Sequence, residues 1–165
     1  MNSSSIINQA VDAVMDLIDA LDLYTTISLG ALGTGNDLVC GIGPSGADEV
    51  YMDKNQFIVL DFTLNGKHTD LQTLSDALNK IHEELTMMHE YPSAEGWQII
   101  DIQTTTLPQQ IGREDSNAWV MASSLAVKLA TYTRNQQQNA ETPQNAEQPQ
   151  NADSQQDAEP PQNAE

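Results

Sequence analysis

The segment from Thr69 to Pro92 constrains the fold more than any other part of the sequence. Apolar side chains recur there every three or four residues, which is the period of a helix with one buried face: Leu71, Leu74, Leu78, Ile81, Leu85 and Met88. Thr69 and Gln72 have the spacing of a capping box at the start of a helix, and we expect Pro92 to close it. Such a helix has to bury its apolar stripe against another element.

A second amphipathic helix is expected near the N-terminus. Its N-cap comes from the serines at 3–5, and its apolar stripe contains Ile7, Val11, Val14, Ile18 and Leu21. Four acidic residues follow the same spacing away from most of that stripe: Asp12, Asp16, Asp19 and Asp22. We interpret them as a solvated helix face, and the alternative is an acidic lining that faces a pore or a basic partner. These acids, with no Lys or Arg before the apolar residues, are atypical of a signal peptide or a membrane span.

Five short segments are expected to be β-strands, namely residues 25–29, 37–42, 57–64, 97–103 and 119–130. Apolar and other side chains alternate with a period of two in 57–64, and large and small side chains alternate in 119–130, where the alanines leave a helix as the alternative. The Asn65-Gly66 pair after the third segment predicts a turn. Helix, strands, helix and strands in this order indicate an α+β fold, with a mostly antiparallel sheet of about four strands and two helices packed on it.

The last part of the chain has a different composition. Residues 135–165 contain no Val, Ile, Leu, Met or aromatic residue and fall into near-repeats of six residues. Such a segment has no apolar surface to offset the entropy of ordering, so we expect it to be disordered. We therefore divide the chain into a folded domain, residues 1–134, and a disordered acidic Gln/Asn/Pro tail, residues 135–165. The tail is interpreted as a solubilising spacer, with a docking peptide as the alternative.

The charge of the chain is strongly one-sided. There are 24 acidic residues against 6 basic ones, and six of the acids lie in the tail, so the folded part keeps a net charge of −12. A surface of this kind repels phosphate, which argues against stable binding to nucleic acid or to an anionic membrane. We expect a protein that is made in the cytoplasm and used or assembled there.

Some segments match parts of known catalytic, metal-binding or cofactor-binding motifs, but the residues around them do not fit such sites. The stretch GIGPSG, residues 41–46, has the glycine spacing of a dinucleotide-binding loop, but no helical pattern follows it and Pro44 lacks an N–H donor. The segment HEELTMMH, residues 82–89, places its histidines seven apart, whereas a zinc protease needs them four apart. Ser45 does not lie in a strand-to-helix elbow, and Cys40, the only cysteine, ends an apolar strand. We therefore expect no catalytic residue, no metal and no cofactor, and we do not expect an enzyme.

The connection LPQQIGREDSNAW, residues 107–119, separates the last two expected strands. It is longer than the two to five residues, roughly, of a tight hairpin, and long loops on a rigid sheet often carry binding residues. Pro108 stiffens this loop and Ile111 presents an apolar side chain. Arg113 is one of only six bases in an acidic chain and can select an acidic partner. With Asp115, these residues form a predicted protein–protein contact loop, and the alternative is a hairpin tip without a partner.

The order of these segments resembles that of the siphophage minor capsid proteins that act as tail terminators. The resemblance rests on an N-terminal helix followed by four segments: GIGPSGADEVYMDKN, FIVLDFTLNGK, TDLQTLSDALNKIHEEL and LPQQIGREDSNAWVMASSLAV. It covers residues 6–132. The Gln- and Asn-rich tail departs from the family pattern.

The resemblance implies a small α+β subunit that closes into a hexameric ring. Such a ring caps the head-proximal end of the tail tube, ends tube polymerisation and joins the tail to the head of the virion. The implied partners are further copies of the chain, the tail tube protein and a neck or head-completion protein, while DNA passes through without specific binding. In such a ring we expect the acids of the first helix to contribute to an acidic lumen. The alternatives are a neck or head-completion protein, or a non-phage soluble binding module with a flexible tail.

Overall fold

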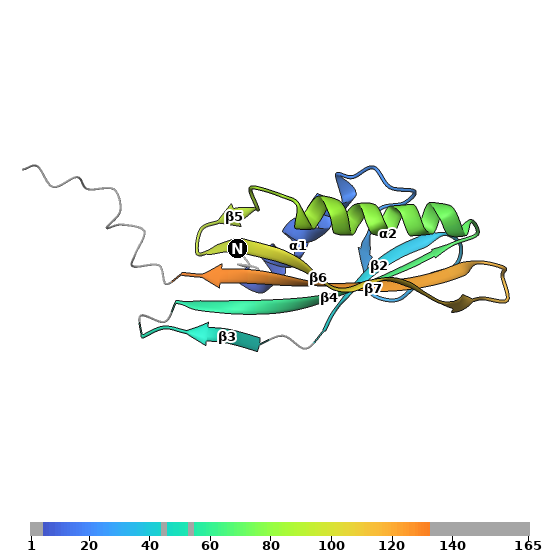
Figure 1. Ribbon diagram of the computed structural model, residues 1–165. Coiled ribbons are helices and arrows are strands. Elements are labelled where there is room, and N and C mark those ends of the chain that lie inside the picture. Colours follow the sequence, from blue (N-terminus) through green and yellow to red (C-terminus); the bar gives the residue numbers. More distant parts are fainter. Residues whose placement is uncertain (1–4, 44–45, 53–54, 133–165) are drawn as a thin grey trace, which may run out of the picture.

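A computed structural model of the chain describes residues 5–43, 46–52 and 55–132 (Figure 1). The elements follow in the order α1 (Ile6–Asp19), β1 (Ser28–Leu29), β2 (Asp37–Ile42), β3 (Gly46–Val50), β4 (Gln56–His68), α2 (Leu71–Thr86), β5 (Ser93–Ala94), β6 (Trp97–Arg113) and β7 (Trp119–Thr131). The expected disordered tail at 135–165 lies outside the described residues, as do Pro44 and Ser45 of the glycine-rich stretch.

The seven strands of the described ranges belong to one sheet. Their order is β1-β2-β4-β7-β6-β5, with β3 paired to β4 beside this path. The pair β1–β2 is parallel and the other pairs are antiparallel. The expectation of a mostly antiparallel sheet of about four strands is therefore wrong, because the sheet is mixed, has seven strands and curls into a half-barrel. The strands β3 and β5 were missed because they are short and lack the alternation that predicts a strand.

The centre of the sheet is the long pair β4–β7, in which the two 13-residue strands are in register throughout. The expected turn at Asn65-Gly66 is wrong, since both residues lie inside β4. Gly66 is buried below the first turn of α2, where an added Cβ would lie 2.5 Å from Cδ1 of Leu74. The glycine is needed because a helix lies close over the strand, and not because the chain reverses direction.

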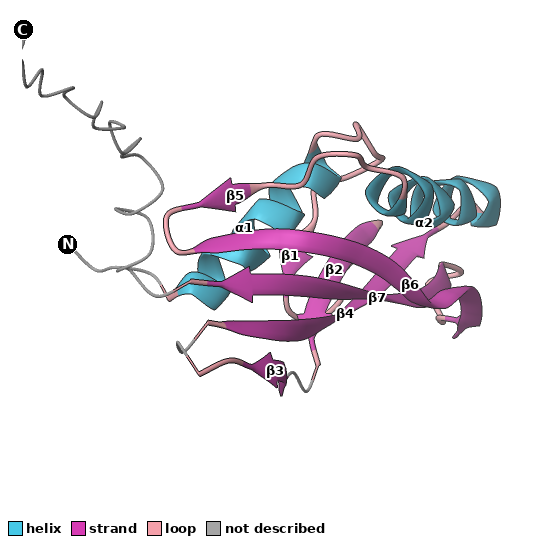
Figure 2. Cartoon of the chain, turned by 60° about the vertical axis from the view of Figure 1, so that its left-hand side comes forward, coloured by secondary structure: helices cyan, strands magenta, loops and turns pink. Residues whose placement is uncertain are grey.

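Both helices cover the same face of the sheet (Figures 1 and 2). Helix α1 begins after Ser5, whose hydroxyl accepts a hydrogen bond from the Asn8 N–H at 3.3 Å. The cap of α2 is Asp70 and not the expected Thr69; its carboxylate accepts from the Thr73 N–H at 3.1 Å. Helix α2 ends at Thr86, so the chain leaves the helix before the proline at 92.

The core lies between the two helices and the face of the sheet that they cover. It contains the apolar stripes of both helices and the inward side chains of the central strands; the largest fully buried ones are Ile18, Leu38, Leu60, Phe62, Leu64, Leu74, Leu78, Ile81, Leu85, Ile99, Ile102 and Leu125. Each such side chain contributes about 1.5–3 kcal/mol by leaving water. The indole of Trp97 on β6 also donates to the Gln9 amide oxygen on α1 at 3.1 Å. No helix in the described ranges has the length and apolar character needed to cross a membrane.

Candidate interaction surfaces

The predicted contact loop is a β-hairpin. Strand β6 continues to Arg113, which pairs with Trp119 at the start of β7, and the connection between the strands is residues 114–118. The expectation of a long loop over residues 107–119 is therefore wrong. The second half of β6 was missed because most of its side chains are exposed on both faces, so its sequence has no alternation of apolar and polar residues.

The turn of this hairpin is held by its own backbone. The Glu114 N–H donates to the Ala118 carbonyl at 2.8 Å, and the Asn117 N–H donates to the Glu114 carbonyl at 2.9 Å. Asn117 has a φ of 68°, a left-handed conformation that asparagine adopts more readily than most residues. The structure thus places Pro108, Ile111 and Arg113 on a paired strand, and only Asp115 in the turn.

The hairpin presents two large apolar side chains to solvent. Leu107 is 71% exposed and Ile111 is 62% exposed. Arg113 lies with its guanidinium carbon 4.7 Å from the centre of the Trp119 ring, and its Nε donates to the Asn117 carbonyl at 3.3 Å. Ile111 and Arg113 therefore lie on the surface where the sequence predicted them, while Leu107, for which the sequence predicted no contact, is the more exposed of the two apolar residues.

The hairpin lies at the edge of the sheet, but its backbone is poorly suited to pairing with another strand. The Ile99 N–H still donates to the Pro92 carbonyl at 3.1 Å, but no described strand pairs with the outer side of β6 beyond Gln98, because β5 pairs only with Trp97 and Gln98. Four register shifts interrupt the pairing of β6 with β7, and Pro108 lacks an N–H donor. Bulges and proline are common features that protect a sheet edge from strand addition. We therefore expect contacts through the side chains of the hairpin.

A buried lysine braces the base of the hairpin. Lys67 on β4 is 4% exposed, and its Nζ donates to the Glu114 carboxylate at 3.1 Å and also to the Gly33 carbonyl. This one ammonium group joins the turn of the hairpin to the loop before β2. An ion that is bonded in this way restrains both segments, since breaking the contacts would leave it buried without a partner.

A second exposed apolar surface lies at the opposite end of β4 and β7, where Gln56 pairs with Thr131. Val50, Tyr51 and Met52 are 63%, 50% and 103% exposed, and Tyr132 is 41% exposed. A groove of about 180 Å³ lies among them, lined by Tyr51, Asn55, Gln56, Phe57, Ala130, Thr131 and Tyr132. The groove was not predictable from the sequence, because its residues come from two distant parts of the chain.

The groove has an aromatic wall and a charged rim. The rings of Tyr51 and Phe57 meet edge to face with centroids 5.9 Å apart, and the Tyr51 hydroxyl donates to the Glu49 carboxylate at 2.8 Å. The Lys128 ammonium lies 4.9 Å from the centre of the Phe57 ring and pairs with Asp48 at 3.1 Å. The hydrogen bond to the Asp48 carboxylate is the main cause of the raised pKa of Lys128, so this lysine stays charged.

The four acids assigned to a lumen do not form one uniform row. Asp12 and Asp16 are exposed on α1. Asp19 ends the helix, and its carboxylate accepts from the Ile27 N–H at 2.7 Å, so it holds the loop that leads to β1. Asp22 lies beyond the helix in a left-handed conformation with a φ of 52°. The role of these acids in a lumen remains a prediction, and Asp12 and Asp16 are the better placed for it.

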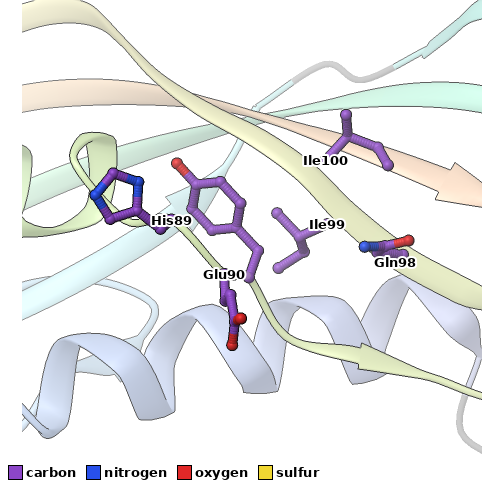
Figure 3. A pocket seen from close by; sticks show the side chains of 6 residues that line it. His89, Glu90, Gln98, Ile99 and Ile100 are labelled. Atoms are coloured by element: carbon purple, nitrogen blue, oxygen red, sulfur yellow. The ribbon is translucent and has the colours of Figure 1, made fainter.

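A wider depression opens beside the segment that joins α2 to β5 (Figure 3). Its volume is about 410 Å³, and it is lined by His89, Glu90, Tyr91, Gln98, Ile99 and Ile100. The side chain of Glu90 points away from His89, so the two do not form an acid–base pair. The Tyr91 hydroxyl donates to the Leu85 carbonyl at 3.0 Å, and burial raises its pKa.

The buried titratable groups serve the core. His82 places Nδ1 2.7 Å from the Thr104 hydroxyl, while its Nε2 is buried without a hydrogen-bond partner among the described residues, and burial lowers its pKa. Burial also raises the pKa of the Cys40 thiol, which keeps it protonated. Within the described ranges, His, Cys, Asp and Glu side chains do not gather in threes in a way that would hold a metal ion. That the protein is not an enzyme remains a prediction.

Comparison with known proteins gives evidence on the fold. No family model matches the sequence, and no curated protein does so either. A chain from a solved structure described as "Virion of native gene transfer agent (GTA) particle" matches with a TM-score of 0.53 and 13% sequence identity. The match covers 77% of this chain and 99% of that chain. At this identity the likeness shows a shared fold, which extends over nearly the whole of the other chain.

Proposed function

We propose that this protein is a structural subunit of a phage-like particle, and that it acts there as a tail terminator. In this role a ring of subunits caps the head-proximal end of the tail tube, ends tube polymerisation and joins the tail to the head. The observation that carries the proposal is the likeness in fold to a chain of a gene transfer agent virion, which is matched over 99% of its length. The sequence resemblance to tail terminators is the reason for proposing this particular role, at the head-proximal end of the tail tube, and not only a virion subunit in general.

The surfaces of the molecule support an assembly role. A capping subunit needs rigid contact surfaces for its neighbours rather than reacting groups. The braced hairpin and the aromatic groove provide two such surfaces at opposite ends of the long strands. Clustered exposed apolar side chains commonly mark interaction sites, whereas scattered ones need no explanation.

The acidic face of α1 suits a channel for DNA. Asp12 and Asp16 are exposed, and the folded part of the chain carries a net charge of −12. Carboxylates around a lumen repel the phosphate backbone, so that DNA passes without adhering. The variant Asp12→Lys with Asp16→Lys would turn this face attractive to DNA. We expect particles of normal tail length but reduced infectivity, whereas a structure of the assembled ring with both residues on its outer rim would contradict this role.

Electron microscopy of particles that lack this protein tests the function. Overlong tail tubes are the expected result, because nothing would then stop tube polymerisation. Tails of normal length that fail to join heads would instead assign the protein to the neck or to head completion. Particles without any defect would leave a binding module outside the virion as the better description.

Light scattering tests the ring directly. A hexamer has six times the single-chain mass of 18.0 kDa, and it is expected either for the protein alone or after addition of tail tube subunits. A single-chain mass under both conditions would contradict the ring.

A further inference from the structure

The two exposed apolar surfaces cannot meet within one molecule. The hairpin surface consists of Leu107, Ile111 and Arg113, and the groove surface consists of the groove beside Tyr51 and Phe57 with its rim. Ile111 and Arg113 lie toward the His68–Trp119 end of the β4–β7 pair, and the groove lies at its Gln56–Thr131 end; the two 13-residue strands pair along their whole length. At about 3.3 Å per residue such a pair is roughly 40 Å long and stiff. Contact between the two surfaces therefore requires two copies of the chain.

The surfaces have complementary shapes and polarity. The hairpin carries two aliphatic side chains that project into solvent. The groove is a concave site of about 180 Å³ whose wall includes the rings of Tyr51 and Phe57. Seating an aliphatic side chain against aromatic rings removes apolar area of both from water, which is the main favourable contribution to most protein interfaces.

The charges are complementary as well. The other described cations are engaged within the molecule: Lys67 pairs with Glu114, Lys80 donates to the Leu21 carbonyl, and Lys128 pairs with Asp48. Arg113 forms no ion pair with a described residue, although it is exposed and held in position by Trp119.

The rim of the groove carries the opposite charge. Asp48 and Glu49 lie beside a single described cation, Lys128, so these three residues have a net negative charge. Glu49 also contacts the Tyr51 ring that lines the groove, through the Tyr51 hydroxyl at 2.8 Å. An arginine that enters beside the groove would meet this carboxylate.

We propose that the hairpin surface of one copy binds in the groove surface of the next copy, with Ile111 against the aromatic wall and Arg113 beside Glu49. Such a contact is head to tail, so each subunit uses both surfaces once and the chain of contacts closes into a ring when the rotation between neighbours permits. The inference rests on the proposed function, because it names the contact from which the proposed ring is built.

Cysteine cross-linking tests the contact. Two single variants, Ile111→Cys on the hairpin and Val50→Cys beside the groove, are mixed at high concentration and mildly oxidised. Val50 pairs with Gln56, a residue of the groove, and is 63% exposed. Cys40 remains in place because it is buried, and the unmodified protein controls for it. The expected result is at least tenfold more disulfide-linked dimer in the mixture than in either variant alone.

A matched control replaces the groove cysteine with Glu84→Cys, an exposed position on α2. Equal dimer yields with the groove and control partners would overturn the proposal. Dimers of the Ile111→Cys variant by itself, at the yield of the mixture, would also overturn it, because they would mean that two hairpins meet each other.

Charge exchange tests the assignment of Arg113 and Glu49. Adding Arg113→Glu to the hairpin variant should lower the dimer yield severalfold, and adding Glu49→Arg to the groove variant should restore it. Unchanged yields in all these mixtures would contradict the pairing of these two residues.

The proposed contact and the proposed function can be contradicted independently of each other. Cross-linking reports which surfaces of two copies meet, whereas tail length in particles without the protein reports what the assembly does. A head-to-tail cross-link from a protein whose loss leaves tail length normal would keep the contact and reject the terminator function. Overlong tails without the cross-link would keep the function and reject the contact.

Discussion

Replacement of Gly66 by alanine tests how closely α2 packs on the sheet. An alanine Cβ at this position would lie 2.5 Å from Leu74 Cδ1 and 3.3 Å from the Tyr24 hydroxyl oxygen. Carbon atoms in good contact are about 3.5–4.0 Å apart. Leu74 is fully buried in the first turn of α2, and Leu38 Cδ1 lies 3.5 Å from the added carbon, so a shift of the Leu74 side chain would press on neighbouring core atoms. Either this side chain changes its conformation within the core, or the helix and the strand move apart.

The size of the effect follows from two opposing contributions. Forcing one extra methyl group into a closed core costs about 1–3 kcal/mol. Alanine also loses less backbone entropy on folding than glycine, which offsets about 0.5–1 kcal/mol of this cost. The middle of these two ranges leaves a net loss of about 1 kcal/mol from a total stability of about 5–15 kcal/mol. For a folded part of this size, the melting temperature should fall by roughly 3–8 °C.

Urea unfolding, followed by circular dichroism and tryptophan fluorescence, measures this loss. The matched control is Gly41→Ala on β2, where an added Cβ meets no atom within 4 Å, so stability should be unchanged or slightly higher. Leu74→Ala alone should cost about 2–5 kcal/mol because it leaves a cavity. The double variant of Gly66 and Leu74 should cost less than the sum of the two, because the new methyl group occupies part of that cavity.

Two outcomes would refute the reasoning. The first is a Gly66→Ala protein that unfolds at the same urea concentration as the Gly41→Ala control. The second is strict additivity in the double variant, since it would mean that the added methyl group and the Leu74 side chain do not compete for space.

The remaining predictions concern single buried or capping groups. Lys67→Met should lower stability by about 1–3 kcal/mol in urea unfolding, because the Glu114 carboxylate and the Gly33 carbonyl lose a charged donor, and an unchanged midpoint would contradict the brace. Burial lowers the pKa of His82 in the folded protein, so the unfolded chain binds a proton at a higher pH than the folded chain does. Stability should therefore fall as the pH drops below the ordinary histidine pKa of about 6.5. The variant His82→Gln should weaken this pH dependence in thermal melts at several pH values. The Cys40 thiol, buried and with a raised pKa, should react with a thiol reagent only after unfolding, and rapid labelling of the native protein would contradict its burial. Asp70→Ala should lower the melting temperature, and Asp70→Asn should lower it much less, because asparagine also caps helices. Hydrogen bonds from Thr73 lower the pKa of Asp70. The contribution of Asp70 to stability is therefore present above the ordinary carboxyl pKa and is lost as the pH falls through the lowered value.

The candidate contact surfaces were only partly predictable from the sequence. Ile111 and Arg113 stood out because an isolated apolar residue and a rare base lay between two predicted strands, and both are exposed on the hairpin. Their position on a paired strand was not predictable, because a strand with both faces exposed to solvent has no alternation of apolar and polar residues. The groove was not predictable from the sequence either, since Phe57 and Tyr132 become neighbours only when β4 and β7 pair.

The sequence by itself determined which side chains are buried along the two helices and along the strands β4 and β7. The stripes of the two helices and the alternation in β4 and β7 predicted these elements, because a helix or a strand with one buried face repeats its apolar residues with its own period. Only the tertiary structure decided which strands pair, how many there are and which surfaces remain exposed. A period describes one element, whereas pairing depends on residues far apart in the chain. Gly66 illustrates the difference, because the sequence is compatible with a turn there and only the position of Leu74 above it requires the glycine within a strand.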